Sequence, residues 1–406
     1  MTWQPTPRTA TARAIYEAAE QDRASRPERY LLKPSAVLDR LAARGFHEDQ
    51  FATGWRAGLE AFLRSADEEG RLNAVGARTA VQSAIGRLTA GAKITQWREE
   101  NPARADVPLA PPIVIVGGWR TGTTFLFRLL GSDPRLHAQL PAELAAPWLF
   151  AESAPNAGPE LSAAGTEMLH TLNPDMAFVH PSGPTLPEEC VLGMGTDMRN
   201  WGFTSFMRLP AYAAWLAGED FGDSYARYRE ALQMLACNDD RRFVLKAPAH
   251  TAELRHIARE FPGAIVIQIH RDIVATIASG ASLFAVYQST YSDDVDAVDV
   301  GCRQADQTEL WFRRAAEFRS SPDRDAVTLI DVDYRELVDD TVRVLEKIYS
   351  AVDMPAPALD EFISDYHAAH PRDAHGTHRY ELADFGLDAA EVRERFALLG
   401  GSSFRP

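Results

Sequence analysis

The chain has 406 residues, of which 46% are hydrophobic, so it is long enough to bury a large core. Its formal net charge of -15 argues against binding to nucleic acid or to an acidic membrane surface, because both are negatively charged and bind positively charged proteins. No apolar stretch reaches the roughly 18 residues of a membrane span, and the N-terminus lacks an apolar signal segment, so we expect a cytoplasmic protein without stable membrane insertion.

The first hundred residues show helical periodicity with charged faces. The pattern predicts four helices, at residues 10–22, 35–44, 48–70 and 72–97. Pro102 and the proline pair at 111–112 end this region. We therefore expect residues 1–108 to form a helical extension packed on a core domain of residues 109–406. Such an extension could cap a binding site or form the surface of a homodimer.

Residues 113–124 combine an apolar β-branched run, a glycine-rich turn and the start of a helix. This order aims backbone N–H groups and a helix dipole at one point, which favours an anion site over an ordinary glycine turn. In a Walker A motif Gly117 and Gly122 would fit, but Thr123 stands where the phosphate-binding lysine belongs. The cation lies instead at Arg120, so the loop indicates phosphate or sulfate binding without nucleoside triphosphate hydrolysis.

Strands and helices alternate along the rest of the chain. Strands are predicted at 113–116, 242–246, 264–269 and 326–331, and helices at 122–131, at several places between 160 and 237, and at 251–260, 272–281, 298–319 and 335–352. This alternation predicts an α/β fold, a three-layer P-loop-like parallel sheet flanked by helices, with ligands at the carboxyl ends of the strands. Arg120, Lys246 and Arg271 each follow a strand, so we expect them at one edge of the sheet.

A second phosphate site is predicted after the strand at 264–269. Arg271 follows this strand, and Ser279 comes about two helical turns later. The two side chains can converge on one phosphate group, although either alone would more often be an ordinary surface residue.

In this order the motifs resemble the sulfotransferases that use 3′-phosphoadenosine 5′-phosphosulfate (PAPS), over roughly residues 110–400. In that family an Arg or Lys followed by Ser/Thr-Gly-Thr-Thr grips the 5′-phosphosulfate, and an Arg and a Ser hold the 3′-phosphate. The segment at 370–380 is similar to the tail of bacterial family members, which folds over the nucleotide. The resemblance implies PAPS as donor, no metal, and these cofactor-binding residues: Gly118, Arg120, Thr121, Gly122, Thr123, Thr124, Arg271, Ser279 and Arg379.

The resemblance also implies catalytic residues for in-line sulfuryl transfer. Arg120 and Lys246 would neutralise the charge that builds on the bridging oxygen. The general base would be Glu143, where bacterial and tyrosylprotein sulfotransferases place a glutamate, or His250, four positions after Lys246. The adjacent carboxylates at 188–189 are a third possibility.

Other residues leave alternatives open. The histidines at 367, 370, 375 and 378 suggest a metal site, but Pro371 and Gly376 interrupt them and no cysteine accompanies them, so we expect a loop instead. The cysteines at 190, 237 and 302 have no metal-ligand spacing. Several aromatic residues could line a pocket for a small hydrophobic hydroxylated acceptor: Trp148, Phe150, Phe178, Trp201, Phe203, Phe206 and Trp215. The alternatives to a sulfotransferase are a P-loop small-molecule kinase and a non-catalytic adenosine-phosphate-binding protein.

Overall fold

A computed structural model describes residues 2–152, 160–370 and 381–397. Within these residues, five parallel strands form one sheet in the order β2-β3-β1-β4-β5. The strands are β1 (Ile113–Gly117), β2 (Leu136–Ala138), β3 (Arg242–Lys246), β4 (Ile265–His270) and β5 (Thr328–Asp333). The predicted α/β fold with a parallel sheet is confirmed. The sequence missed β2, because three residues are too few to show a strand period.

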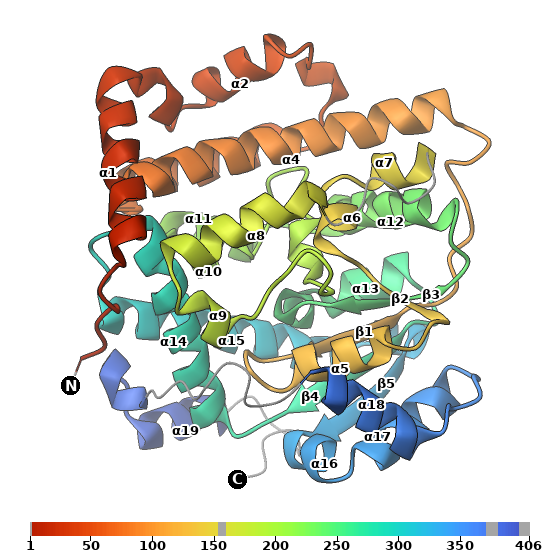
Figure 1. Ribbon diagram of the computed structural model, residues 1–406. Coiled ribbons are helices and arrows are strands. Elements are labelled where there is room, and N and C mark those ends of the chain that lie inside the picture. Colours follow the sequence, from red (N-terminus) through yellow and green to blue (C-terminus); the bar gives the residue numbers. More distant parts are fainter. Residues whose placement is uncertain (1, 153–159, 371–380, 398–406) are drawn as a thin grey trace.

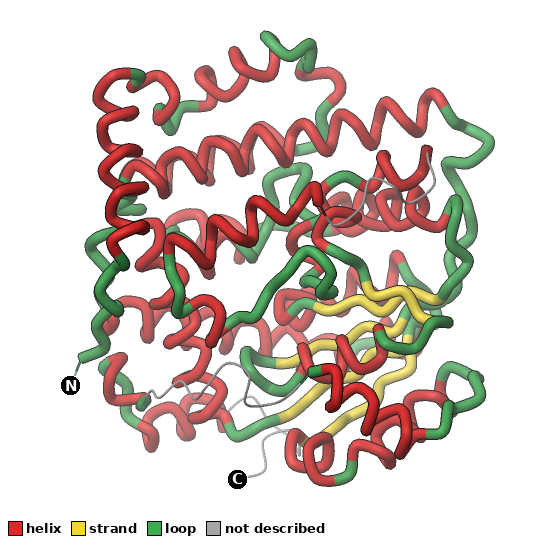
Figure 2. The backbone as a smooth tube through the Cα atoms, in the orientation of Figure 1, coloured by secondary structure: helices red, strands yellow, loops and turns green. Residues whose placement is uncertain are grey.

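The sheet lies between two layers of helices, and the alternation of side chains along β1 explains how. Ile113 and Ile115 pack with α5 (Thr123–Gly131), α17 (Thr341–Ala351) and α18 (Leu359–Ala369). Val114 and Val116 point to the other face, toward α12 (Gly222–Ala236), α13 (Leu254–Glu260) and α15 (Ala297–Arg319). Both faces are therefore apolar, as expected for a parallel sheet covered on both sides. Figure 2 shows the strands grouped together with helices on either side.

The N-terminal helices are α1 (Ala10–Ser25), α2 (Pro34–Ala42), α3 (Trp55–Glu69) and α4 (Ala74–Glu100). Leu59 and Phe62 of α3 and Leu88 of α4 belong to the same buried cluster as Val114 of the central strand. The hydrophobic core is thus continuous across the boundary expected at residue 108. Helix α4 extends across the molecule in Figure 1.

A long insertion connects the neighbouring strands β2 and β3. It contains α6 (Pro141–Ala145), α7 (Pro147–Glu152), α8 (Glu160–Leu172), α9 (Met176–Val179), the short 3-10 helix η3 (Cys190–Leu192), α10 (Phe203–Phe206), α11 (Pro210–Gly218) and α12. Much of this insertion lies between the sheet and α4 (Figure 1). The insertion supplies many of the side chains of the site described below.

Helix α14 (Ile273–Tyr291) follows β4 and is longer than the predicted segment at 272–281. The ten residues after 281 contain neither glycine nor proline, and most of them are buried, so tertiary packing extends the helix. It is the one helix in the described ranges long and apolar enough to cross a membrane, but 78% of that apolar window is buried inside the molecule. The remaining elements are the 3-10 helices η4 (Pro248–Glu253) and η6 (Leu382–Phe385), α16 (Tyr334–Asp339) and α19 (Ala389–Ala397), together with η1 (Pro27–Tyr30), η2 (Glu48–Gln50) and η5 (Pro322–Ala326).

Candidate functional site

The loop between β1 and α5 has a tightly constrained backbone. Gly117 has a φ of 147°, and a Cβ there would lie 2.7 Å from the carbonyl oxygen of Ile269. At Gly118 a Cβ would lie 2.5 Å from the methyl group of Thr276. The side chain of Arg120 is carried by a left-handed backbone with a φ of 60°, which costs a non-glycine residue roughly 1 kcal/mol. Only small residues fit the start of this loop.

The loop delivers the N-terminus of α5 to the carboxyl edge of the sheet. Gly122 is the N-cap and offers no side chain to the first N–H groups of the helix. These N–H groups have no acceptor within the helix and favour an anion, as does the helix dipole. Thr121 closes the loop by donating its hydroxyl to the Gly118 carbonyl oxygen at 2.9 Å. Thr123, in the first turn of α5, is buried.

Lys246 ends β3 beside this loop and is almost completely buried. Its Nζ donates to Thr124 Oγ1 at 3.1 Å and to Glu189 Oε1 at 2.7 Å. Lys246 therefore joins the first turn of α5 to the carboxylate of Glu189, and the buried cation is compensated by that carboxylate.

Arg271 brings a second cation to the same loop, as its position after β4 predicts. Its Nη1 donates to the backbone carbonyl of Arg120 at 2.5 Å, and its guanidinium lies 4.3 Å from the ring centre of Tyr334. Ser279 is buried on α14, and it shares a helix face with Thr276, which contacts the loop. Arg120, Lys246 and Arg271 thus meet at one edge of the sheet, whereas Arg379 lies outside the described residues.

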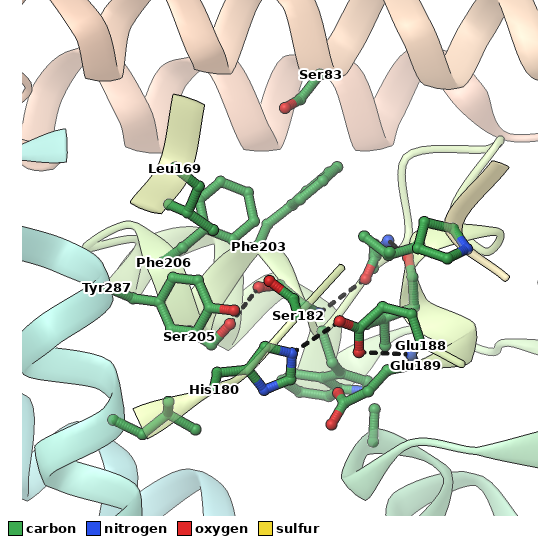
Figure 3. A pocket seen from close by; sticks show the side chains of 18 of the residues that line it. Ser83, Leu169, His180, Ser182, Glu188, Glu189, Phe203, Ser205, Phe206 and Tyr287 are labelled. Atoms are coloured by element: carbon green, nitrogen blue, oxygen red, sulfur yellow. Dashed lines mark hydrogen bonds and ion pairs between the residues drawn. The ribbon is translucent and has the colours of Figure 1, made fainter. Parts of the chain in front are cut away.

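A chain of contacts leads from Arg120 back to Lys246. Arg120 Nη1 donates to the carbonyl of Val179 at 2.9 Å. The next residue, His180, has its Nε2 2.9 Å from Glu188 Oε2. The backbone N–H of Glu189 donates to Glu188 Oε1 at 2.9 Å, and Glu189 in turn accepts from Lys246. Figure 3 shows His180, Glu188 and Glu189 together at one side of a pocket.

The charges of this group stabilise ionised Glu188. Burial alone would raise the pKa of Glu188, but the charge of His180 and its hydrogen bond, with smaller contributions from Lys246 and the backbone N–H of Glu189, lower this pKa to about 2. Glu188 is therefore a carboxylate across the physiological pH range.

The pocket beside these residues, called here the aromatic cavity, has a volume of about 320 Å³. Its lining includes Trp119 of the loop and Trp201, Phe203, Phe206, Leu283, Tyr287 and Trp311, together with His180, Glu188 and Glu189. Trp201 is fixed by a hydrogen bond from Nε1 to the buried Glu253, at 3.0 Å. Of the aromatic residues expected to line a pocket, Trp201, Phe203 and Phe206 do so, whereas the structure places Trp148, Phe150, Phe178 and Trp215 elsewhere.

Glu143 lies in a different, polar cavity, which is lined by Arg128, His137, Glu143, Thr185, Arg241 and His370 among others. Its carboxylate accepts from the backbone N–H of Leu140 at 2.7 Å, as part of the α6 cap, and lies 3.1 Å from His137 Nε2. Burial disfavours protonated His137, but Asp239 and Glu143 outweigh that effect and raise the pKa of His137. Glu143 does not line the aromatic cavity.

His250 does not line the aromatic cavity either. Its side chain is fully buried behind β3, with Nδ1 2.7 Å from the hydroxyl of Tyr225. Burial lowers the pKa of His250 to about 3, so its imidazole is neutral at physiological pH. Its Nε2 has no hydrogen-bond partner within the described ranges.

The histidine cluster is only partly described. His367 stacks on Phe125, and His370 stacks on Tyr366. His375 and His378 lie outside the described residues. Among those that are described, no group of three or more His, Cys, Asp or Glu side chains could hold a metal ion.

The sequence did not single out His180, although the structure places it beside Glu188 in the wall of the aromatic cavity. The residue lies in a stretch without strand or helix periodicity, so no pattern marked it. The adjacent carboxylates Glu188 and Glu189 after Pro187 were the signal that could have directed attention to this segment. Their link to Lys246 depends on the fold.

Comparison with known proteins relates this arrangement to one family. A sulfotransferase family matches residues 111–358. The fold is similar to the solved structure of sulfotransferase STF1 from Mycobacterium tuberculosis H37Rv, at 26% identity, covering 90% of this chain and 98% of that chain with a TM-score of 0.76. It is also similar to sulfotransferase STF9 from Mycobacterium avium, at 22% identity, 90% and 95% coverage and a TM-score of 0.74. No curated protein matches the chain significantly in sequence.

Proposed function

The chain belongs to the sulfotransferase family, and from this premise we propose that it transfers a sulfuryl group from PAPS to a hydroxyl of a small hydrophobic molecule. The observation that carries the proposal is the closed chain of contacts from Arg120 through His180 and Glu189 to Lys246. It brings the cations of an anion site against carboxylates at the wall of an apolar cavity. Such a junction suits a transfer between an anionic donor and an apolar acceptor.

The donor would bind along the carboxyl edge of the sheet. The 5′-phosphosulfate fits the N–H groups of the loop and of α5, with Gly118, Thr121, Gly122, Thr123 and Thr124 around it. Arg271 and Ser279 would hold the 3′-phosphate, and Arg379 is proposed to cover the nucleotide. Gly117 and Gly118 hold the loop close to β4 and α14, because a Cβ at either position would overlap Ile269 or Thr276.

Charge stabilisation would come from Lys246 and Arg120. As the bond from sulfur to the bridging oxygen breaks, negative charge builds on that oxygen, and these two cations would neutralise it. Each such contact contributes roughly 10²–10³ to turnover in comparable sites. Cations and backbone N–H groups would then do the work that Mg²⁺ does in kinases, so the proposed reaction needs no metal.

We assign the general base to Glu189 in preference to Glu143 or His250. Glu189 lines the aromatic cavity and touches Lys246, so one carboxylate reaches both the acceptor side and the donor side. It would accept the proton of the acceptor hydroxyl as the new oxygen–sulfur bond forms. Glu143 is engaged by the α6 cap and by His137, and His250 is buried behind the strand.

The acceptor would occupy the aromatic cavity. Rings from the loop, from α10 and from α15 form apolar walls, and the acidic residues lie together at one side. An apolar alcohol or phenol matches these walls better than a sugar does. We propose that the enzyme acts on such a molecule in the cytoplasm.

Calorimetry would test the donor assignment directly. We expect 3′-phosphoadenosine 5′-phosphate to bind without metal, and ATP with Mg²⁺ to bind much more weakly, because Thr123 replaces the Walker lysine. Arg271→Ala should weaken binding of 3′-phosphoadenosine 5′-phosphate and leave the affinity for adenosine 5′-phosphosulfate, which has no 3′-phosphate, unchanged. Equal or tighter binding of ATP would favour the kinase alternative, and binding without any turnover of apolar alcohols would favour a non-catalytic protein.

A further inference from the structure

Helix α4 places three polar side chains in the wall of the aromatic cavity. Thr79, Ser83 and Arg87 follow one another at intervals of four residues, so they share one face of the helix. All three line the cavity. Figure 3 shows Ser83 on α4, across the pocket from His180, Glu188 and Glu189. The cavity therefore has one acidic side and one side that carries a cation and hydroxyl groups.

The cation of this wall has no acidic partner. Arg87 donates from Nη1 and Nη2 to the backbone carbonyls of Leu192 and Val191, and among the described residues no carboxylate lies within ion-pair distance of it. Burial lowers the pKa of Arg87 to about 10, so it is charged at neutral pH. Ser83, one turn away, makes no hydrogen bond with any described group, whereas Thr79 donates to the carbonyl of Val75.

A partly buried cation is costly unless an anion or strong hydrogen-bond acceptor compensates it. Two other cations with little exposure have a carboxylate partner, since Lys246 pairs with Glu189 and Arg314 with Glu253. At Arg87 the main-chain carbonyls supply only partial charges. The carboxylates of the cavity lie on its opposite side, so an anionic group of a molecule bound in the cavity could compensate Arg87 directly.

We propose that Arg87 and Ser83 form a subsite for a carboxylate of the acceptor, so that the substrate class is an apolar hydroxy acid. Its carboxylate lies against α4 and its hydroxyl faces Glu189. A guanidinium and a neighbouring hydroxyl are well suited to a carboxylate, which accepts several charge-assisted hydrogen bonds. The position of the hydroxyl at Glu189 depends on the proposed function, whereas the position of the carboxylate is inferred only from the side chains of α4.

Equilibrium binding tests the subsite without any sulfuryl transfer. Decanoate, decanol and decylamine share one apolar chain and differ in the head group, and three cavity residues are tryptophans, so their fluorescence reports occupancy. We expect decanoate to bind wild-type protein at least tenfold more tightly than decanol or decylamine. Arg87→Met should abolish this preference, and Ser83→Ala should reduce it about threefold. Arg78→Met is the matched control, because Arg78 is also on α4 but outside the cavity, and it should change nothing.

Two outcomes would overturn the subsite. If decanoate and decanol bind wild-type protein equally, no carboxylate is recognised. If Arg87→Met weakens the binding of decanol as much as that of decanoate, the role of Arg87 is structural, through its hydrogen bonds to residues 191–192. The subsite and the proposed function are tested separately. Failure of 3′-phosphoadenosine 5′-phosphate to bind in calorimetry would refute the transferase assignment. A preference for decanoate that depends on Arg87 would still support the subsite.

Discussion

Two glutamate–histidine pairs lie on opposite sides of α6, and they differ in what surrounds them. Pro141 of this helix lines the aromatic cavity, and Glu143 of the same helix lines the polar cavity. In the polar cavity, Glu143 caps α6 and shares His137 with Asp239. In the aromatic cavity, Glu188 pairs with His180, and its neighbour Glu189 reaches Lys246.

The two pairs contain the same residue types but differ in their contacts, and this difference is the basis for assigning them different roles. The hydrogen-bonding capacity of Glu143 is used by the backbone and by an imidazole, which are contacts that stabilise a fold. Glu189 is connected instead, through Lys246, to the loop that we propose binds the donor, and it borders a cavity with a volume of about 320 Å³. If this contrast is correct, turnover depends on the pair at the aromatic cavity and not on the pair at the polar cavity.

The largest expected effect is on turnover in Glu189→Gln. Removing a general base costs roughly 10²–10⁴ in rate, so kcat for an apolar alcohol should fall by that factor, while affinity for 3′-phosphoadenosine 5′-phosphate is retained. The matched variant Glu143→Gln should keep kcat near the wild-type value. Steady-state kinetics on both variants distinguishes the two candidates. An inactive Glu143→Gln and an active Glu189→Gln would contradict our assignment and would support Glu143, the base suggested by the sequence.

The next largest effect is expected for Lys246→Met, which removes the link between Glu189 and Thr124 in the first turn of α5. Loss of a cation that stabilises the leaving oxygen should lower kcat by roughly 10²–10³. Arg241→Met is the comparison in the polar cavity, where Arg241 pairs with Asp239, and it should leave kcat unchanged. Because Lys246→Met also leaves Glu189 without its partner, circular dichroism should first establish that the variant folds. A folded Lys246→Met protein with normal turnover would contradict the proposed mechanism.

The sequence predicted the loop side of the site better than the cavity side, for a physical reason. Gly117 to Thr124 are consecutive, and the glycines and Arg120 carry their signal in a single short segment. Arg271 was also placed correctly, because residues that follow parallel strands meet at one edge of the sheet. The strands themselves were readable because burial on both faces makes them continuous apolar runs.

The aromatic cavity could not be predicted in this way. Its walls come from α4, the insertion between β2 and β3, α14 and α15, which meet only through tertiary packing. The position of His180 beside Glu188 depends on the path of a segment without regular periodicity. Sequence spacing likewise could not show that Glu143 is engaged by His137, since β2 itself is too short to be recognised.

A smaller effect, on stability, is expected in the polar cavity. The two carboxylates raise the pKa of His137 above its unfolded value, so the protonated imidazole stabilises the folded state fully below about pH 6.5. This contribution is lost as pH rises through the folded pKa. His137→Gln should therefore lower the free energy of unfolding by roughly 1–3 kcal/mol at pH 6 and by less at pH 9. Denaturant unfolding at both pH values measures the difference, and a larger loss at pH 9 would contradict the pairing.

The smallest effect is expected for His180→Asn, because His180 acts through Glu188 and not on the acceptor. Glu188 accepts from the backbone N–H of Glu189, so losing the imidazole loosens the support of the proposed base without removing it. We expect kcat to fall about tenfold, equivalent to roughly 1.4 kcal/mol, with unchanged affinity for 3′-phosphoadenosine 5′-phosphate. His137→Asn, the matched change in the other pair, should leave kcat unaffected. A loss in His180→Asn as large as that in Glu189→Gln would instead make His180 the base and Glu188 the carboxylate that orients it.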